Sequence, residues 1–148
     1  MTIAIDKIIH KIRISAGDAH YAGDLVDGTK LLQFFGDVAT EILVRHDGDE
    51  GLFRAYESIE FLAPVYSGDF LEIEGTLLQT GNTSRKIQFE ARKVITLLKP
   101  AESGYLAPSS AKVLKPSIIV CKAIGTCVTP KNLQHTLKKP PRDLEKIK

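Results

Sequence analysis

The chain has 148 residues, 43% of them hydrophobic and 26% charged, with a formal net charge of +2. This composition is typical of one soluble globular domain, and no apolar run approaches the roughly 20 residues that cross a bilayer. Because the N-terminus also lacks the residue order of a secretory signal peptide, we expect a cytoplasmic protein that binds no membrane.

The chain opens with an alternating segment at residues 7–14, where isoleucines recur on one face together with His10. Such alternation predicts a first strand, in which His10 is a packed or edge residue. Residues 15–27 are polar and contain Gly17 and Gly23, which permit unusual backbone angles. We therefore predict a loop that leads into a helix.

The helix is predicted to run from Gly28 to about Arg45, with Asp24 or Asp27 as its N-cap. Its apolar residues cover more than one face: Leu31, Leu32, Phe34, Phe35, Val38, Ala39, Ile42 and Leu43. A helix that is apolar over so much of its circumference is buried. The remaining polar residues form one narrow stripe: Gln33, Asp37 and Glu41.

A turn signal at residues 46–51 ends the helix, and three alternating segments follow it. These predict strands at residues 52–62, 70–79 and 85–97, joined by turns at 67–69 and 80–84. The apolar residues that share one side of each strand are Phe53, Ala55, Ile59, Phe61, Leu71, Ile73, Leu77, Ile87, Phe89 and Ala91.

Residues 98–116 break the alternation with three prolines, a glycine and serines, which predicts a long loop. Residues 117–128 are nearly all apolar, which predicts a last strand that is covered on both faces. Cys121 and Cys127 lie six residues apart on this strand, and at about 3.3 Å per residue they are too distant for a disulfide. We expect reduced, buried thiols and no metal site, because the histidines show no ligand spacing.

The basic residues concentrate after residue 130, where six Lys or Arg stand against two Asp or Glu. We predict a domain at residues 1–129 and a basic C-terminal tail at residues 130–148. The tail is either solvated or a contact for phosphates, such as those of coenzyme A. Nucleic-acid binding is not indicated, because no basic groove with interleaved aromatic residues is present.

The predicted order is therefore β-α-β-β-β-β, an α+β domain in which an antiparallel sheet packs one face on a long central helix. The apolar outer face of the last strand needs a partner. The simplest partner is a second copy of the chain that continues the sheet, so we expect a homodimer or a multiple of dimers.

This order and three local sequences resemble the hotdog fold of acyl-CoA thioesterases and dehydratases. The sequences are HYAGDLVDG (20–28), ESIEFLAPVYSGDFLEIEG (57–75) and TGNTSRKIQFEARK (80–93). The match is closer to one branch, the amino-acyl-CoA ammonia-lyases, through SAGDAHYAGDLVDGTKLLQFFGDVATE (15–41), DGDEGLF (47–53) and EFLAPVYSGDF (60–70). The resemblance covers roughly residues 7–129.

The resemblance implies a lyase that releases ammonia from 3-aminobutyryl-CoA, or from β-alanyl-CoA, to give the 2-enoyl-CoA, which is crotonyl-CoA in the first case, as in lysine fermentation. It implies no cofactor, since coenzyme A arrives as part of the substrate. Hotdog thioesterases and dehydratases carry an acid in the second turn of the helix. Here that place falls on or near Gln33 or Phe35, so a plain thioesterase is the weaker alternative. A non-catalytic acyl-CoA-binding protein is the third.

Removal of the proton beside a thioester carbonyl puts negative charge on the carbonyl oxygen, which donors at a helix N-terminus stabilise. Gly28 N–H is the first candidate donor, because a glycine lets the thioester approach closely. Tyr21 would donate to the carbonyl or the amine, or else only pack. The loop acids Asp24 and Asp27 would attract the substrate ammonium, or else only cap the helix.

The acid or base is expected to be His20 in the loop before the helix, because histidine is the side chain suited to proton transfer near neutral pH, or one of the helix carboxylates, Asp37 and Glu41. We expect burial on the helix to raise the pKa of these carboxylates. A polar, basic hairpin is formed by Asn82, Thr83, Ser84, Arg85 and Lys86. It would bind the phosphates of coenzyme A, or else it is an ordinary turn.

Overall fold

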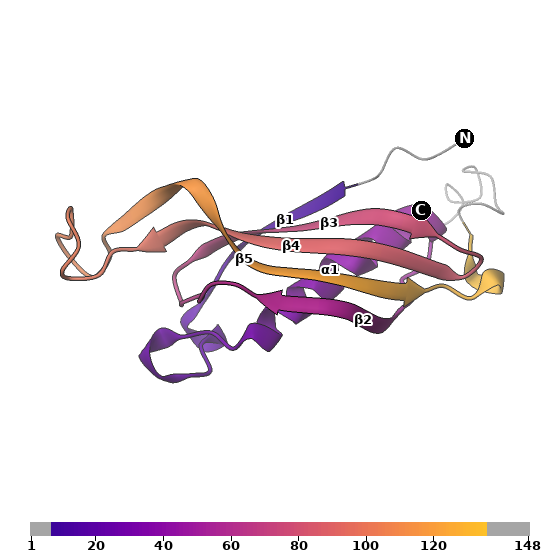
Figure 1. Ribbon diagram of the computed structural model, residues 1–148, viewed down its shortest axis with the longest axis horizontal. Coiled ribbons are helices and arrows are strands. Elements are labelled where there is room, and N and C mark those ends of the chain that lie inside the picture. The colour runs from indigo at the N-terminus through magenta and orange to yellow at the C-terminus, as the bar shows by residue number, and fades with distance from the viewer. Residues whose placement is uncertain (1–6, 136–148) are drawn as a thin grey trace, which may run out of the picture.

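The computed structural model describes residues 7–135. Within them, the helix α1 (Gly28–Asp47) packs against an antiparallel sheet of five strands: β1 (Lys7–Arg13), β2 (Leu52–Phe61), β3 (Phe70–Thr80), β4 (Ser84–Leu97) and β5 (Ala111–Val128). The strands lie in the order β1-β3-β4-β5-β2, with β1 and β2 at the two edges. Figure 1 shows α1 crossing behind the sheet, so the predicted α+β architecture is confirmed.

Helix α1 is capped at both ends by residues suited to those positions. The Asp27 side chain accepts a hydrogen bond from Thr29 N–H, at 3.0 Å between N and Oδ1. Gly48 ends the helix at φ 75°, a left-handed conformation that favours glycine. Asp27 rather than Asp24 is therefore the N-cap, and the helix extends two residues beyond the predicted Arg45.

The core lies between α1 and the inner face of the sheet. The Phe35 ring stacks on that of Phe89 at a centroid distance of 5.0 Å. Gly75 lies under the helix, where a Cβ would stand 2.5 Å from Val38 Cγ1, so only glycine lets the helix pack this close to β3. As predicted, the buried strand residues include Leu71, Ile73, Ile87, Phe89 and Ala91.

Strand β2 does not keep the simple alternation that the sequence predicts. Its register with β5 shifts twice, once between Phe53 and Ala55 and once between Tyr56 and Ser58. Each shift inserts one residue, and an inserted residue reverses the side of every residue after it. Tyr56 consequently pairs with Gly125 and packs against Phe89, while Ala55 pairs with Thr126. The prediction that placed Ala55 beside Phe53 is wrong.

The long loop predicted at residues 98–116 is shorter than expected. Strand β5 begins at Ala111, and residues 111–113 pair with residues 95–97 of β4, so the two strands form an arm that extends beyond the core (Figure 1). A register shift between Lys93 and Ile95 leaves a bulge that contains Pro116. Proline is tolerated in a strand at such a bulge, because its missing N–H is not needed there.

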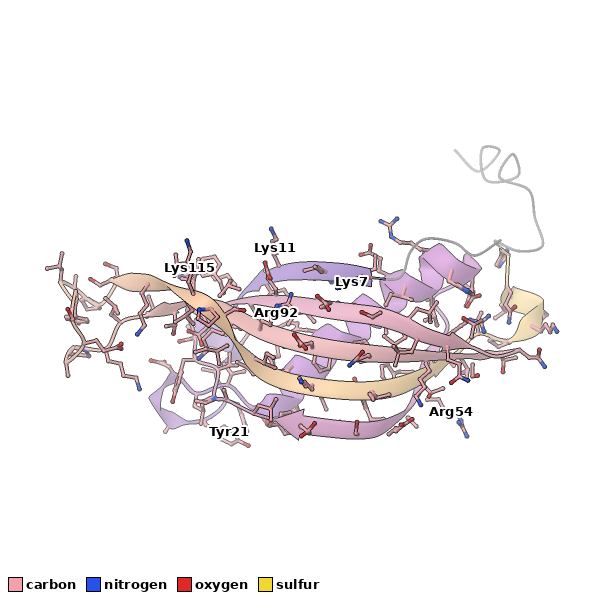
Figure 2. All side chains as sticks on the ribbon, turned by 45° about the horizontal axis from the view of Figure 1, so that its top comes forward. Lys7, Lys11, Tyr21, Arg54, Arg92 and Lys115 are labelled. Atoms are coloured by element: carbon pink, nitrogen blue, oxygen red, sulfur yellow. The ribbon has the colours of Figure 1, made fainter. Side chains whose placement is uncertain are left out.

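The outer face of the sheet carries charged residues that pair across strands. Arg92 lies at the centre of this face (Figure 2), within 3.3 Å of carboxylate oxygens on Glu72, Glu74 and Glu90. A network of four charges contributes more to folding stability than isolated surface ion pairs do. Among residues 7–135, no helix is long and apolar enough to cross a membrane.

The first residues of the predicted tail are attached to the domain. Gln134 is 5% exposed, and its side-chain amide donates to the carbonyls of Asn82 and Thr129 at 2.8 and 3.0 Å. His135 N–H donates to Asp47 O at 2.7 Å. The rest of the predicted basic tail lies outside the described residues.

Candidate active site

A cavity of about 570 Å³ lies at the N-terminus of α1. Its walls come from the loop before the helix, the first helical turn and the segment that follows β2: Tyr21, Leu25, Val26, Asp27, Gly28, Thr29, Leu31, Phe61, Leu62, Ala63, Pro64 and Val65. We call it the N-terminal cavity. A backbone hydrogen bond from Val26 N–H to Val65 O, at 2.8 Å, holds the two loops together. The structure thus brings together three of the predicted site residues, Tyr21, Asp27 and Gly28.

The backbone N–H groups of the first helical turn differ in whether the protein supplies them with a hydrogen-bond acceptor. Thr29 N–H donates to the Asp27 carboxylate and Lys30 N–H to the Asp27 carbonyl. Within residues 7–135, no group accepts a hydrogen bond from Gly28 N–H, so this donor is left for a ligand. The helix dipole adds partial positive charge at the same place.

Gly28 also sits under an aromatic ring. A Cβ on Gly28 would stand 2.6 Å from Phe61 Cε1, closer than real carbon contacts. Phe61 is 56% exposed, so its ring stands at the mouth of the cavity instead of filling the core. The glycine therefore allows tight packing against Phe61, and a side chain at this position would require that exposed ring to move.

His20 lies next to the N-terminal cavity but does not line it. Its side chain borders a separate hollow of about 280 Å³, together with Asp27, Thr29, Lys30 and others. The imidazole contacts the ring of Tyr21 at a centroid distance of 5.1 Å, and Figure 2 shows Tyr21 at the rim of the molecule. Asp27 and Thr29 border both hollows and therefore lie between His20 and the N-terminal cavity.

The helix carboxylates lie away from these hollows. Asp37 is exposed, nine residues along the helix from Gly28, or about 14 Å at 1.5 Å per residue. Glu41 accepts hydrogen bonds from His10 and Arg45, at 2.7 and 2.8 Å. The hydrogen bond from His10, followed by that from Arg45, lowers the pKa of Glu41 below its usual range. The prediction of a raised pKa at Glu41 is wrong, because the side chain is only partly buried and has two basic partners.

This lowered pKa makes stability depend on pH. The ionised Glu41 favours the folded state fully above its ordinary pKa of about 4.5, and the contribution is lost as the pH falls through the lower folded value. In urea unfolding between pH 3 and 7, Glu41→Gln should be less stable than wild type near neutrality, and the difference should shrink below pH 4.5. Asp37→Asn, an exposed control on the same helix, should follow wild type throughout. A pH-independent difference would contradict this account.

Asp24 is also separated from the N-terminal cavity. It adopts φ 63°, which is uncommon for a residue with a side chain, and its carbonyl accepts from Ser67 N–H at 3.0 Å. It borders a second cavity of about 500 Å³, which lies between the loops and the β4–β5 arm. The second cavity is bordered further by Tyr66, Asp69, Lys93 and other residues of the arm.

The predicted phosphate-binding hairpin lies at the opposite end of the protomer. Arg85 is 1% exposed and donates twice to the Asp47 carboxylate, at 2.8 and 2.9 Å, so it is not available to a phosphate and that assignment is wrong. Burial would raise the pKa of Asp47, but the hydrogen bonds from Arg85 and its other partners lower it. Lys86 pairs with Glu57 at 3.0 Å.

Asn82 and Thr83 are exposed at the tip of the same hairpin and Ser84 is partly exposed. The 20 residues of α1 separate this tip from Gly28 by about 30 Å. Within one protomer, the hairpin and the N-terminal cavity are therefore too far apart to border the same pocket.

Two buried ion pairs were missed by the sequence analysis. Lys93 is 6% exposed and Asp69 is 1% exposed, with Nζ and Oδ2 3.1 Å apart. Arg85 and Lys93 occupy alternate positions in register with Ile87, Phe89 and Ala91, which are all buried. This alternation could have predicted the two buried ion pairs from the sequence, since a charged residue on a buried face requires a partner of opposite charge.

Other residues discussed in the sequence analysis have structural roles or are exposed. Of the two residues on or near which the acid of hotdog thioesterases was expected to fall, Phe35 is fully buried in the core and Gln33 is exposed. Cys121 and Cys127 are free and buried, and burial raises the pKa of their thiols to about 11 and 12. Within residues 7–135, no three His, Cys, Asp or Glu residues gather as metal ligands.

Comparisons with known proteins agree with the fold. The model of the thioesterase superfamily matches residues 26–97. The chain is 56% identical, over 87% of its length and 98% of the relative's, to 3-aminobutyryl-CoA ammonia lyase of Acetoanaerobium sticklandii. The structure of β-alanyl-CoA:ammonia lyase from Clostridium propionicum is 39% identical, with a TM-score of 0.81 over 87% of this chain and 88% of that one.

More distant structures share only the fold. A hexameric hotdog fold thioesterase of Campylobacter jejuni is 17% identical, with a TM-score of 0.65 over 93% of this chain and 92% of that one.

Proposed function

The chain belongs to the hotdog-fold ammonia lyases that act on amino-acyl-CoA thioesters, and we propose that it releases ammonia from 3-aminobutyryl-CoA to give crotonyl-CoA. It is thus a carbon–nitrogen lyase. The reverse reaction adds ammonia across the double bond of the enoyl thioester. We place this reaction in the cytoplasm, in the degradation of lysine, with coenzyme A arriving only on the substrate.

The observation that carries this proposal is the N-terminal cavity with Gly28 N–H at its edge. Loss of the proton next to the thioester carbonyl places negative charge on the carbonyl oxygen. A donor at a helix N-terminus that no protein group uses stabilises this charge. The remaining walls are largely apolar, which suits a short acyl chain.

The acid and base are proposed among the polar groups around this cavity. Asp27 has one carboxylate oxygen committed to the helix cap, and its charge would hold the substrate ammonium. His20, across Asp27, is the proposed group that takes and returns the proton. Tyr21 would donate to the carbonyl or the leaving amine. Asp37 lies on the exposed face of α1, where only a partner subunit would bring a substrate near it.

A second copy of the chain is proposed to complete the site. Strand β2 is an edge strand with exposed Leu52, Ile59 and Phe61, and an unpaired edge of this kind binds another strand. Antiparallel pairing of two β2 strands would set the Leu52 end of one copy beside the Phe61 end of the other.

That pairing would bring the partner's hairpin close to the cavity. The hairpin residue Ser84 lies two strands away from Leu52 in the same register, about 10 Å at the usual strand spacing. In this arrangement Asn82, Thr83, Ser84 and Lys86 of one copy would bind the coenzyme A of a substrate whose thioester lies at Gly28 of the other copy.

The function is tested by mixing the protein with crotonyl-CoA and ammonium at mildly alkaline pH. We expect loss of the enoyl thioester absorbance that requires ammonium and releases no free thiol. Thiol release without a requirement for ammonium would show a thioesterase instead. Coenzyme A binding with neither signal would show a non-catalytic acyl-CoA-binding protein.

A further inference from the structure

Two cavities of the protomer share a thin wall. The residues bordering the N-terminal cavity end at Val65 on one chain segment, and those bordering the second cavity begin at Tyr66. On the loop before the helix, Leu25 borders the N-terminal cavity and Asp24 borders the second cavity. We call residues 24–26 and 64–67 the partition. Its two segments are joined by an antiparallel bridge at Leu25 and Tyr66, which consists of two backbone hydrogen bonds, from Val26 N–H to Val65 O and from Ser67 N–H to Asp24 O.

The partition has irregular backbone, and the buried ion pair of Lys93 and Asp69 forms hydrogen bonds to it. Lys93 Nζ donates to Pro64 O at 2.7 Å, and the Asp69 carboxylate accepts from Tyr66 N–H at 2.8 Å. Lys93 Nζ and Asp69 Oδ2 lie 3.1 Å apart, and Thr96 Oγ1 donates to the other oxygen of Asp69. Lys93 therefore fixes the residues that close one side of the N-terminal cavity, although its own side chain borders only the second cavity.

A buried lysine is not needed to stabilise a core. Burying its charge costs desolvation free energy, and apolar residues of similar volume often give equal or greater stability. Here the ammonium group satisfies a carbonyl of a segment that forms no strand. Arg85 provides a comparison, since it is the other buried cation on the inner face of β4 and its ion pair lies at the far end of the sheet.

We propose that Lys93 is a positioning residue that sets acyl-chain length, by holding the partition closed against the second cavity. This rests on the proposed function. With the partition fixed, the N-terminal cavity ends at Pro64 and Val65 and accepts a short acyl group. When the partition loosens, a longer chain extends toward the second cavity.

The experiment measures ammonia addition to crotonyl-CoA and to 2-hexenoyl-CoA in wild type, Lys93→Met and Arg85→Met, at a temperature where each is folded. The two substrates differ by two methylenes, and one methylene is typically discriminated by about 10–200-fold. If Lys93→Met removes part of this discrimination, the kcat/KM ratio of 2-hexenoyl-CoA to crotonyl-CoA should rise about tenfold. Inhibition by free coenzyme A should not change. In Arg85→Met the ratio should stay at the wild-type value even though stability falls.

Thr96→Val provides a milder variant if Lys93→Met does not fold. It removes one hydrogen bond to Asp69 without leaving a buried charge unpaired, and it should raise the ratio by less, in the same direction. An unchanged or lower ratio in the folded variants, or an equal rise in Arg85→Met, would overturn the proposal. Wild type that adds no ammonia to crotonyl-CoA would instead overturn the proposed function.

Discussion

Gly28→Pro is expected to lower kcat by about 10²–10³-fold, the usual cost of removing one donor to an oxyanion. Proline has no N–H, and position 28 is the first residue of the helix, where proline is well tolerated. Asp27 before it has φ −65° and ψ 133°, angles that a residue preceding proline adopts. Because the donor acts on charge that develops only in the transition state, KM should change much less than kcat.

Gly28→Ala is the matched control for this variant. It keeps the N–H but adds a Cβ, which would meet the ring of Phe61 at 2.6 Å unless that exposed ring moves. Both variants carry the Cβ, so the ratio of their kcat values reports the loss of the N–H together with the two further ring carbons of proline. Equal kcat in the proline and alanine variants would exclude Gly28 N–H as the oxyanion donor.

Arg85→Met is expected to lower the free energy of unfolding by about 3–5 kcal/mol, because it leaves a buried carboxylate without its partner. Asp47 and Arg85 are both essentially inaccessible, and the guanidinium also donates to the carbonyls of Gly81 and Ser84. Urea unfolding at one fixed protein concentration measures the loss, since association would otherwise change the apparent stability.

The double variant Arg85→Met with Asp47→Leu should recover most of that stability. Replacing both members of a buried ion pair by apolar residues is often neutral, whereas removing one is not. Should the double variant be as unstable as the single one, the loss would come from the hairpin carbonyls that Arg85 satisfies, and not from the unpaired Asp47 charge.

The sequence predicts the fold well because its signals are local and repeated. The helix between Asp27 and Gly48 has a cap at each end, and β3 and β4 alternate without interruption over their inner-facing residues. The errors arise where extra residues change a register. Each bulge in β2 inserts one residue, and together they put Tyr56 on the side predicted for Ala55. In β5, residues 114–117 lie opposite a single residue of β4, and Pro116 within them made the start of this strand look like part of a loop.

The site was predicted less completely, because it is made by segments far apart in the chain. Tyr21, Asp27 and Gly28 are close in sequence and meet at one cavity. The other half of the cavity, residues 61–65, follows only once β2 is folded back along the helix. Glu41 and Arg85 carried the right chemistry for a site, but each had a partner, His10 and Asp47, that lies more than 30 residues away.

The two bulges of β2 are expected to affect which chains this edge strand can pair with. A straight, exposed edge strand pairs readily with any extended segment of an unfolded chain. An edge whose spacing is interrupted twice within ten residues does not match a regular strand along its length. A second copy of the same strand, turned around a two-fold axis, carries the same irregularities in the reverse order. We therefore expect this edge to pair more readily with a second copy of the same strand than with other extended chains.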